Sequence, residues 1–261
     1  MEMTPLFWSE FGVFFLAALF GGAAVLPYSI RLLKGSGKPL KMSISKLVLL
    51  SFLQSAVLSA IVIGLGLLAA HAVGLSAPYI EAALTGSASV QPIVSMLGIA
   101  TVLGVLAGAV LLVADMFFLP YWPEQIVDTA RKTTLWENFL ASLYGGINEE
   151  LLMRLFGFSV LVWLLSFISY PNIAIFWIVN VVMAVVFGIG HLPALKGLVG
   201  KISSIMLART LLLNAPIGLL CGWLFWTYGI EAAIVAHFSA DIVYHVFGTI
   251  VLRRKLGAAI N

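Results

Sequence analysis

Long apolar runs separated by short polar connections occupy nearly the whole chain. Each run is about 20 residues or longer, which is the length a helix needs to cross roughly 30 Å of hydrocarbon. The pattern predicts an all-α, polytopic membrane helical bundle of about seven transmembrane helices, with eight as the alternative count. The predicted spans are 7–30, 47–72, 93–118, 148–167, 173–190, 205–228 and 232–252.

The composition agrees with a chain that lies mostly in the membrane. It is 62% hydrophobic and only 10% charged, whereas soluble domains carry about 25% charged residues. The first run follows an acidic N-terminus without a small-residue cleavage pattern, so we expect a retained span rather than a signal peptide. We divide the chain into N-terminal transmembrane helices with an interfacial segment (1–135), a catalytic transmembrane core (136–252) and a cytoplasmic tail (253–261).

The charged residues predict the orientation in the membrane. Lysine and arginine occur in alternate connections, and the remaining connections carry only acidic residues, so the positive-inside rule places the N-terminus outside and the C-terminus in the cytoplasm. The net charge of +3 is spread over several loops instead of one face, and no nucleic-acid partner is expected. The basic residues of these connections and of the tail are Arg31, Lys34, Lys38, Lys41, Lys46, Arg131, Lys132, Lys196, Lys201, Arg253, Arg254 and Lys255, and the acidic residues on the other side are Glu2, Glu10, Glu81 and Glu231.

Other polar positions are expected at the membrane surfaces. Residues 120–141 mix aromatic and charged side chains, as segments at the headgroup level do. Arg209 is interpreted as an anchor that extends to the headgroups, and His71 as a solvated residue at the outer surface. Asp115 is expected to form a hydrogen bond between helices.

Candidate chemistry begins with Glu149, Glu150 and Arg154, which lie together in an apolar run. A charge in the bilayer core costs about 2.5 to 3.5 kcal/mol on insertion scales, so such residues usually face a partner or a water-filled cavity. Residues four apart share a helix face, which pairs Glu150 with Arg154. Glu149 is rotated by about 100° from Glu150 and is left free for another task.

Histidines in two later runs complete the candidate site. His191 closes the fifth run, and His237, Asp241 and His245 form a polar stripe on the seventh. A carboxylate near two imidazoles in a partly desolvated cavity can act as a water-activating base, and the histidines can donate to a developing oxyanion. The pattern favours hydrolysis, although each group taken alone could serve only to hold helices together.

Three motifs in this order resemble the CPBP (Abi) family of intramembrane proteases, which includes CAAX prenyl endopeptidases and bacteriocin-processing or immunity proteins. The motifs are Glu149-Glu150-x-x-x-Arg154, Phe187-x-x-x-His191 and His237-x-x-x-Asp241. The resemblance implies that Glu149 activates water and that His191 and His237 assist. It also implies an asparagine at position 241 that helps hold the oxyanion, where this chain has Asp241. An ionised Asp241 would repel an oxyanion, so it must be protonated, orient His237 or bind a cation.

The sequence leaves the need for a metal open. The family implies a metal-free glutamate mechanism without a cofactor, but Glu149, His191 and His237 form an alternative zinc site with an open position. Cys221 is the only cysteine, which excludes an intramolecular disulfide and a Cys-based zinc site. We expect it to be a small buried side chain.

The leading functional hypothesis is an intramembrane endopeptidase whose partners are membrane lipids and a hydrophobic or lipid-modified polypeptide substrate. Because position 241 departs from the family pattern, a non-catalytic immunity or scaffold protein that binds a peptide in the same cavity is the alternative. A proton-coupled transporter is a third hypothesis, but the chain lacks the inverted repeat typical of that class. The predicted span ends leave one conflict, because they separate Glu149 and His191 from His237 by about 10 to 15 Å in depth.

Overall fold

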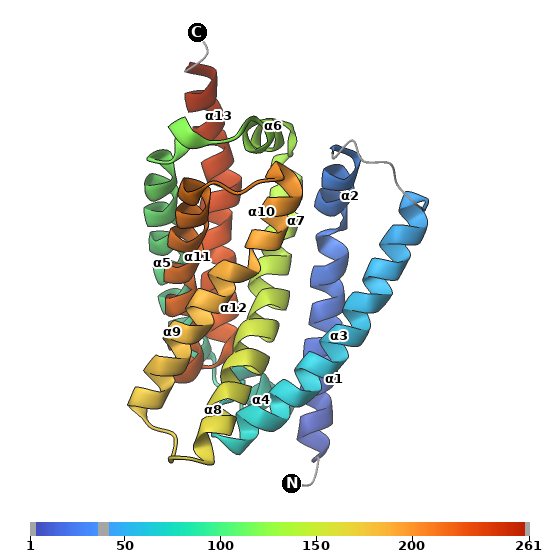
Figure 1. Ribbon diagram of the computed structural model, residues 1–261. Coiled ribbons are helices and arrows are strands. Elements are labelled where there is room, and N and C mark those ends of the chain that lie inside the picture. The colour runs from blue at the N-terminus through green and yellow to red at the C-terminus, as the bar shows by residue number, and fades with distance from the viewer. Residues whose placement is uncertain (1–3, 36–41, 259–261) are drawn as a thin grey trace.

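The computed structural model describes residues 4–35 and 42–258, and helices are the regular secondary structure of this part of the chain (Figure 1). Glu2, Lys38 and Lys41, which enter the topology prediction, lie outside the described residues. The α-helices are α1 (Pro5–Ala24), α2 (Leu26–Gly35), α3 (Ile44–Ala72), α4 (Pro78–Leu84), α5 (Val90–Met116), α6 (Glu124–Lys132), α7 (Leu135–Tyr144), α8 (Ser159–Ser166), α9 (Ile173–Gly190), α10 (Leu192–Val199), α11 (Ser204–Tyr228), α12 (Ile230–Asp241) and α13 (Gly248–Ala258). A 3₁₀ turn covers Leu119–Tyr121, and π-helical segments cover Gly145–Glu149, Leu151–Phe158 and Ile242–Phe247.

Six helices among the described residues are long and apolar enough to cross a membrane, which confirms the predicted helical membrane bundle. Large apolar side chains also point outward, for example Leu16, Val57 and Val110, each more than 60% exposed. In a bilayer such side chains face lipid tails, so the chain is an integral membrane protein. The six spans are Pro5–Lys34, Ile44–Ala72, Val90–Met116, Ile173–Val199, Ser204–Tyr228 and Ile230–Lys255.

The fourth predicted span starts earlier than the apolar pattern indicated. Helical residues run without a break from Leu135 to Ser166, through α7, two π-helical segments and α8. The apolar pattern identified 148–167 as a span, but it did not include residues 135–147, which were assigned in part to the interfacial segment. Glu149 lies about 20 Å along the helix from its start at 1.5 Å per residue. Its neighbour Glu150 lies 2.6 Å from His237, so the predicted difference in depth is absent.

The predicted interfacial segment divides into two parts. Helix α6 lies across one end of the bundle, whereas α7 enters the bundle (Figure 1). A capping box separates them, because the Thr134 hydroxyl accepts from the backbone N–H of Glu137 and the Glu137 carboxylate accepts from that of Thr134. On α6 the exposed Lys132 ammonium donates to Asp128 at 2.8 Å and thereby lowers the pKa of that carboxyl.

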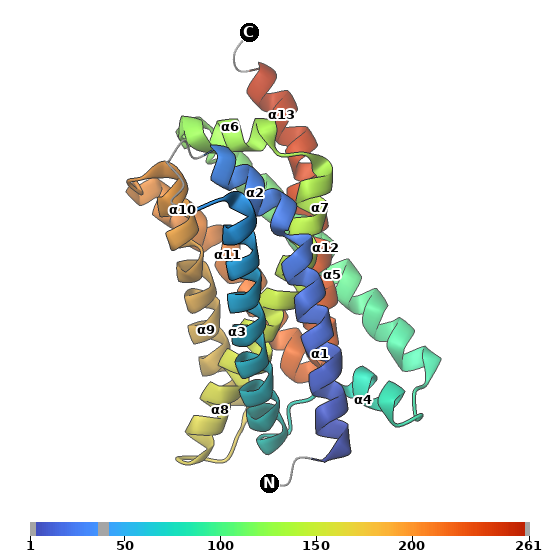
Figure 2. The ribbon, with the colours of Figure 1, turned by 90° about the vertical axis from the view of Figure 1, so that its right-hand side faces the viewer.

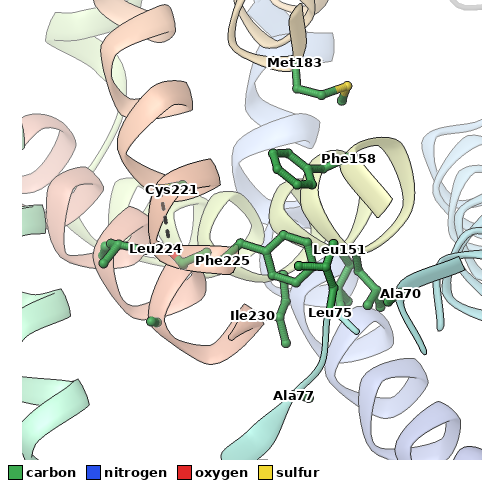
Figure 3. Packing of buried hydrophobic residues seen from close by; sticks show 14 of the residues in the cluster. Ala70, Leu75, Ala77, Leu151, Phe158, Met183, Cys221, Leu224, Phe225 and Ile230 are labelled. Carbon is green, nitrogen blue, oxygen red and sulfur yellow. Dashed lines mark hydrogen bonds between the residues drawn. The ribbon is translucent and has the colours of Figure 1, made fainter. Parts of the chain in front are cut away.

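The core lies where the helices of the predicted catalytic region pack against α3. Aromatic and aliphatic side chains from α3, α8, α11 and the second π-helical segment meet there, and Phe158 packs edge-on against Phe225 at 5.7 Å (Figure 3). Helices α1 and α3 lie side by side along one face of the bundle (Figure 2). Cys221 is fully buried in this core and unpaired, as expected.

Glycines let α5 approach α12 closely. A Cβ atom at Gly104 would overlap the backbone oxygen of Ala236, and one at Gly108 would lie 2.5 Å from the backbone oxygen of Ala240. Small residues at such crossings are typical of membrane helix packing, which depends on close van der Waals contact. The contact positions α12, the helix that carries His237.

Replacing Gly104 by alanine is expected to destabilise the protein by about 1 to 3 kcal/mol, because the methyl group forces α5 and α12 apart. The free energy of unfolding, measured by titrating detergent micelles with SDS, tests this. Gly98→Ala is the matched control on the same helix, since a Cβ there meets no described atom within 4 Å. Equal stability of the two variants would contradict the packing role of Gly104.

Three polar residues expected at the membrane surfaces are paired inside the protein, so those interpretations were wrong. Glu10 is completely buried on α1, and His71 Nε2 lies 3.1 Å from its carboxylate. Arg209 forms a two-pronged ion pair with buried Asp115 at 2.6 and 2.7 Å instead of extending to the headgroups. Asp115 also accepts from the hydroxyl of Tyr244 at 2.6 Å. Asp115 thus joins α5 to α11 and to the segment after α12, as predicted for an inter-helix contact.

Candidate active site

A buried polar cluster of Glu150, Arg154 and His237 lies at the meeting point of three helical segments. His237 Nδ1 donates to Glu150 Oε1 at 2.6 Å, and Arg154 Nη1 lies 3.0 Å from the same oxygen. Each of the three residues is at most 3% exposed. Arg154 also donates through Nη2 to the backbone oxygen of Gly218 on α11 at 2.8 Å. Glu150 therefore fixes the His237 ring while Arg154 balances its charge.

Close backbone approach brings these groups together. A Cβ at Gly145 would lie 2.5 Å from Asp241 Oδ2, and one at Gly146 would lie 2.8 Å from the Cβ of Phe238. The two glycines thus let the helix that carries Glu149 and Glu150 lie directly against α12. Phe187 of α9 fills the other side, with its ring edge-on to His237 at 5.6 Å and under the Arg154 guanidinium at 5.1 Å.

Glu149 and His191 form a second, more open pair beside the buried cluster. His191 Nε2 lies 3.9 Å from Glu149 Oε2, and the two side chains are 37% and 26% exposed. The backbone oxygen of Phe187 can only accept a hydrogen bond, so His191 donates to it through Nδ1 at 2.8 Å. This bond orients the ring with Nε2 toward Glu149, where a water molecule or a substrate can reach both groups.

Asp241 lies between two histidines. Its Oδ1 atom is 3.8 Å from His237 Nε2 and 3.7 Å from His245 Nε2. The Asp241 side chain is 18% exposed and that of His245 is 49% exposed. The Asp241 carboxylate therefore lies near Nε2 of His237, whereas Glu150 contacts Nδ1 of the same ring.

The structure thus brings together all six residues singled out from the sequence, but in two groups. Helix geometry predicts the pairing of Glu150 with Arg154 and the separation of Glu149 from both. The contact between His237 and Glu150 was not predicted, because residues 87 positions apart come together only through packing. His245, which the sequence indicated only as part of a polar stripe, lies beside Asp241.

The π-helical segments are a further feature of the site that the apolar pattern does not reveal. Two of them contain Glu149 and Arg154, and the third begins directly after Asp241 and contains His245. Such wide turns are rare and frequently occur at functional sites, where they change the direction of side chains. The paired glycines before Glu149 were the one local signal of unusual backbone here.

Two groups of three metal-ligating side chains occur among the described residues, and neither is the set Glu149, His191 and His237. One consists of Glu150, Cys221 and His237, whose ligand atoms lie within 4.8 Å of one another. The Arg154 guanidinium already occupies the carboxylate of that group and would repel a cation. The other group consists of Glu10, His71 and Glu81, far along the chain from the candidate active site.

Fold and site together define a helical membrane protein with a buried glutamate–arginine–histidine cluster and an accessible glutamate–histidine pair. Residues 131–243 match the model of the family described as type II CAAX prenyl endopeptidase Rce1-like. This segment contains Glu149, His191, His237 and Asp241, so the part of the chain that holds the site is similar to this family, which confirms the resemblance predicted from the motifs. No curated protein and no solved structure matches the chain.

Proposed function

We propose that the protein is an intramembrane endopeptidase that hydrolyses a peptide bond in a small hydrophobic or lipid-modified polypeptide through glutamate-activated water. The observation that carries the proposal is the accessible pair of Glu149 and His191 beside the buried cluster of Glu150, Arg154 and His237. The family description, a prenyl endopeptidase, supports a prenylated CAAX-type tail as the first substrate class to test.

In the proposed reaction Glu149 takes a proton from water while the water oxygen attacks the carbonyl carbon of the scissile bond. His191 Nε2 holds the same water in place, since Nδ1 is occupied by the backbone oxygen of Phe187. The carbonyl oxygen becomes negative, and a protonated Nε2 of His237 donates to it. The C–N bond then breaks, and Glu149 returns the proton to the leaving nitrogen.

Glu150 and Arg154 act through His237 in this mechanism. The bond from His237 Nδ1 to Glu150 sets the direction of the ring and leaves Nε2 facing the site. Asp241, 3.8 Å from that Nε2, serves as the orienting partner rather than as an oxyanion donor. This role reconciles the carboxylate at position 241 with catalysis.

A glutamate mechanism without zinc is the form of the proposal that the contacts favour. Glu149 contacts His191, whereas His237 contacts Glu150, so the three potential zinc ligands belong to two separate pairs. Zinc bound by Glu149, His191 and His237 stays the alternative mechanism. It requires His237 to turn away from a 2.6 Å contact with a carboxylate.

For the orientation, we propose an N-terminus outside and a C-terminus in the cytoplasm. The elements that carry basic residues, including α2, α6 and α13, lie at one end of the bundle, and α1 begins at the other (Figure 1). The positive-inside rule places the basic end in the cytoplasm. We retain 136–252 as the catalytic core and 253–261 as the cytoplasmic tail, although α13 continues as a helix into this tail.

Purified protein in liposomes is expected to cleave a synthetic peptide that carries a prenylated cysteine and a three-residue tail, releasing that tail. Mass spectrometry of the products gives the cleaved bond. A matched peptide without the prenyl group is the control, because it separates recognition of the lipid from recognition of an apolar sequence. A protein that cleaves neither peptide, nor a panel of hydrophobic precursors, would contradict the proposal.

Metal chelators distinguish the two mechanisms in the same assay. Cleavage is expected to persist in EDTA and in 1,10-phenanthroline if glutamate acts without zinc, and to stop if zinc is the catalyst.

The alternative function, a binding protein without activity, is favoured by the carboxylate at position 241. Such a protein would bind the peptide unchanged, and Glu149→Gln would leave its biological effect intact.

A further inference from the structure

A second group of acidic and histidine side chains lies away from the candidate active site. It contains Glu10 from α1, His71 from α3 and Glu81 from α4, whose ligand atoms lie within 4.8 Å of one another. Helix α4 and the start of α1 lie at the end of the bundle opposite the basic elements (Figures 1 and 2). Three separate helices supply the three side chains, so the tertiary fold creates the cluster.

Glu10 is a buried carboxylate with a single charged partner among the described residues. Its side chain is completely inaccessible, and in the described part of the chain neither carboxylate oxygen accepts a hydrogen bond of good geometry. Its one ion pair among the described residues is with His71, at 3.1 Å. A buried carboxylate normally needs a paired charge or a metal ion. The protein therefore places a buried carboxylate, whose one partner among the described residues is itself a potential ligand, directly beside Glu81.

His71 and Glu81 are held in place for binding. The His71 ring packs edge-on against the buried Phe7 at 6.3 Å, and its side chain is 27% exposed, which leaves a route from solvent. Glu81 Oε1 accepts from the backbone N–H of Ala77 at 3.1 Å, which leaves Oε2 for a ligand. Both side chains are thus oriented by bonds and contacts outside the cluster, as the residues around metal sites commonly are.

We propose that Glu10, His71 and Glu81 bind a zinc ion and that this site joins α1, α3 and α4. Imidazole nitrogen and carboxylate oxygen are both zinc donors, and a water as fourth ligand would complete a tetrahedral set. The dication balances the two carboxylates with His71 neutral. The imidazole favours zinc over magnesium or calcium, which prefer oxygen donors. The ligand atoms lie within 4.8 Å of one another and need to close by up to about 1.5 Å to reach the spacing of a tetrahedral zinc site.

The proposed zinc site connects to the helix of His237. Glu231, at the start of α12, accepts from the backbone N–H groups of Tyr79 and Ile80 at 3.0 and 2.8 Å. It thereby binds the first turn of α4, the helix that supplies Glu81. The metal would stabilise α1 and α3 against α4, and through Glu231 against the catalytic region, without touching the reacting groups.

Metal analysis and thermal unfolding of the purified full chain test the zinc site directly. Protein stripped with EDTA, dialysed and exposed to zinc chloride is expected to retain one zinc per chain after desalting. Its melting temperature, followed by tryptophan fluorescence, is expected to rise with zinc concentration, because a ligand of the folded state shifts unfolding. Magnesium chloride is expected to produce no rise.

Three variants locate the ion. His71→Ala is expected to lose the zinc, and Glu81→Gln to raise the dissociation constant at least tenfold, since loss of an outer partner alone costs 10- to 100-fold. Glu81 is partly exposed, so this conservative variant tests binding even if His71→Ala fails to fold. Cys221→Ala, which removes a donor from the other three-donor group, is expected to keep the zinc. Wild-type protein without zinc, or zinc that depends on Cys221 but not on Glu81, would overturn the proposal.

Discussion

Replacing Glu149 by glutamine is expected to lower kcat for peptide cleavage by about 10²- to 10⁴-fold, the usual contribution of a general base. Glutamine has nearly the same shape as glutamate but cannot accept a proton from water at neutral pH. The substrate KM is expected to change little, because the proposed role of Glu149 concerns the water rather than the peptide. Initial rates in liposomes, measured over a range of peptide concentrations, separate these two effects.

Glu124→Gln is the matched control for this prediction. Glu124 is exposed in the first turn of α6, so the substitution removes the same charge outside the site. We expect unchanged cleavage by this variant, and unfolding temperatures close to wild type for both variants. Full activity of Glu149→Gln would remove Glu149 from the mechanism and leave the binding-protein alternative or another base.

Replacing Arg154 by leucine is expected to destabilise the protein by about 3 to 5 kcal/mol, because loss of one partner leaves a buried charge uncompensated. Arg154 is 1% exposed, and Glu150, its partner at 3.0 Å, is 0% exposed. The backbone oxygen of Gly218 would also lose its donor. The free energy of unfolding in mixed detergent and SDS micelles measures this loss.

The surface residue Arg131 supplies the comparison. It is exposed on α6, where an arginine contributes little to folding, so Arg131→Leu is expected to stay within about 0.5 kcal/mol of wild type. The double variant Arg154→Leu with Glu150→Gln is expected to recover part of the lost stability, since it removes the uncompensated carboxylate. If Arg154→Leu were as stable as wild type, the ion pair would have no structural role.

Hydropathy predicted the membrane helices well where the runs were uniformly apolar. The span 173–190 coincides with α9, and the ends of most other spans shift by only a few residues. Prediction was poorest at 148–167, because the helix begins at Leu135, in a stretch whose mixed aromatic and charged residues indicated the membrane surface.

Surface assignments failed for a related reason. Glu10, His71 and Arg209 lie near the ends of apolar runs, where a charged residue usually reaches water. In this protein each has a partner on another helix, namely His71 for Glu10 and Asp115 for Arg209. A single sequence shows the position of a charge along its helix but not the charge on the helix beside it.

The sequence was sufficient for the class of protein, the motif residues and the pairing of Glu150 with Arg154, because hydrophobic length and helical spacing are local properties. The tertiary structure decided that His237 binds Glu150, that Glu149 lies with His191, and that Asp241 lies between two histidines. It also assembled Glu10, His71 and Glu81 from three helices. These contacts depend on how helices pack, at glycines such as Gly104 and Gly145, and packing is a property of the folded chain as a whole.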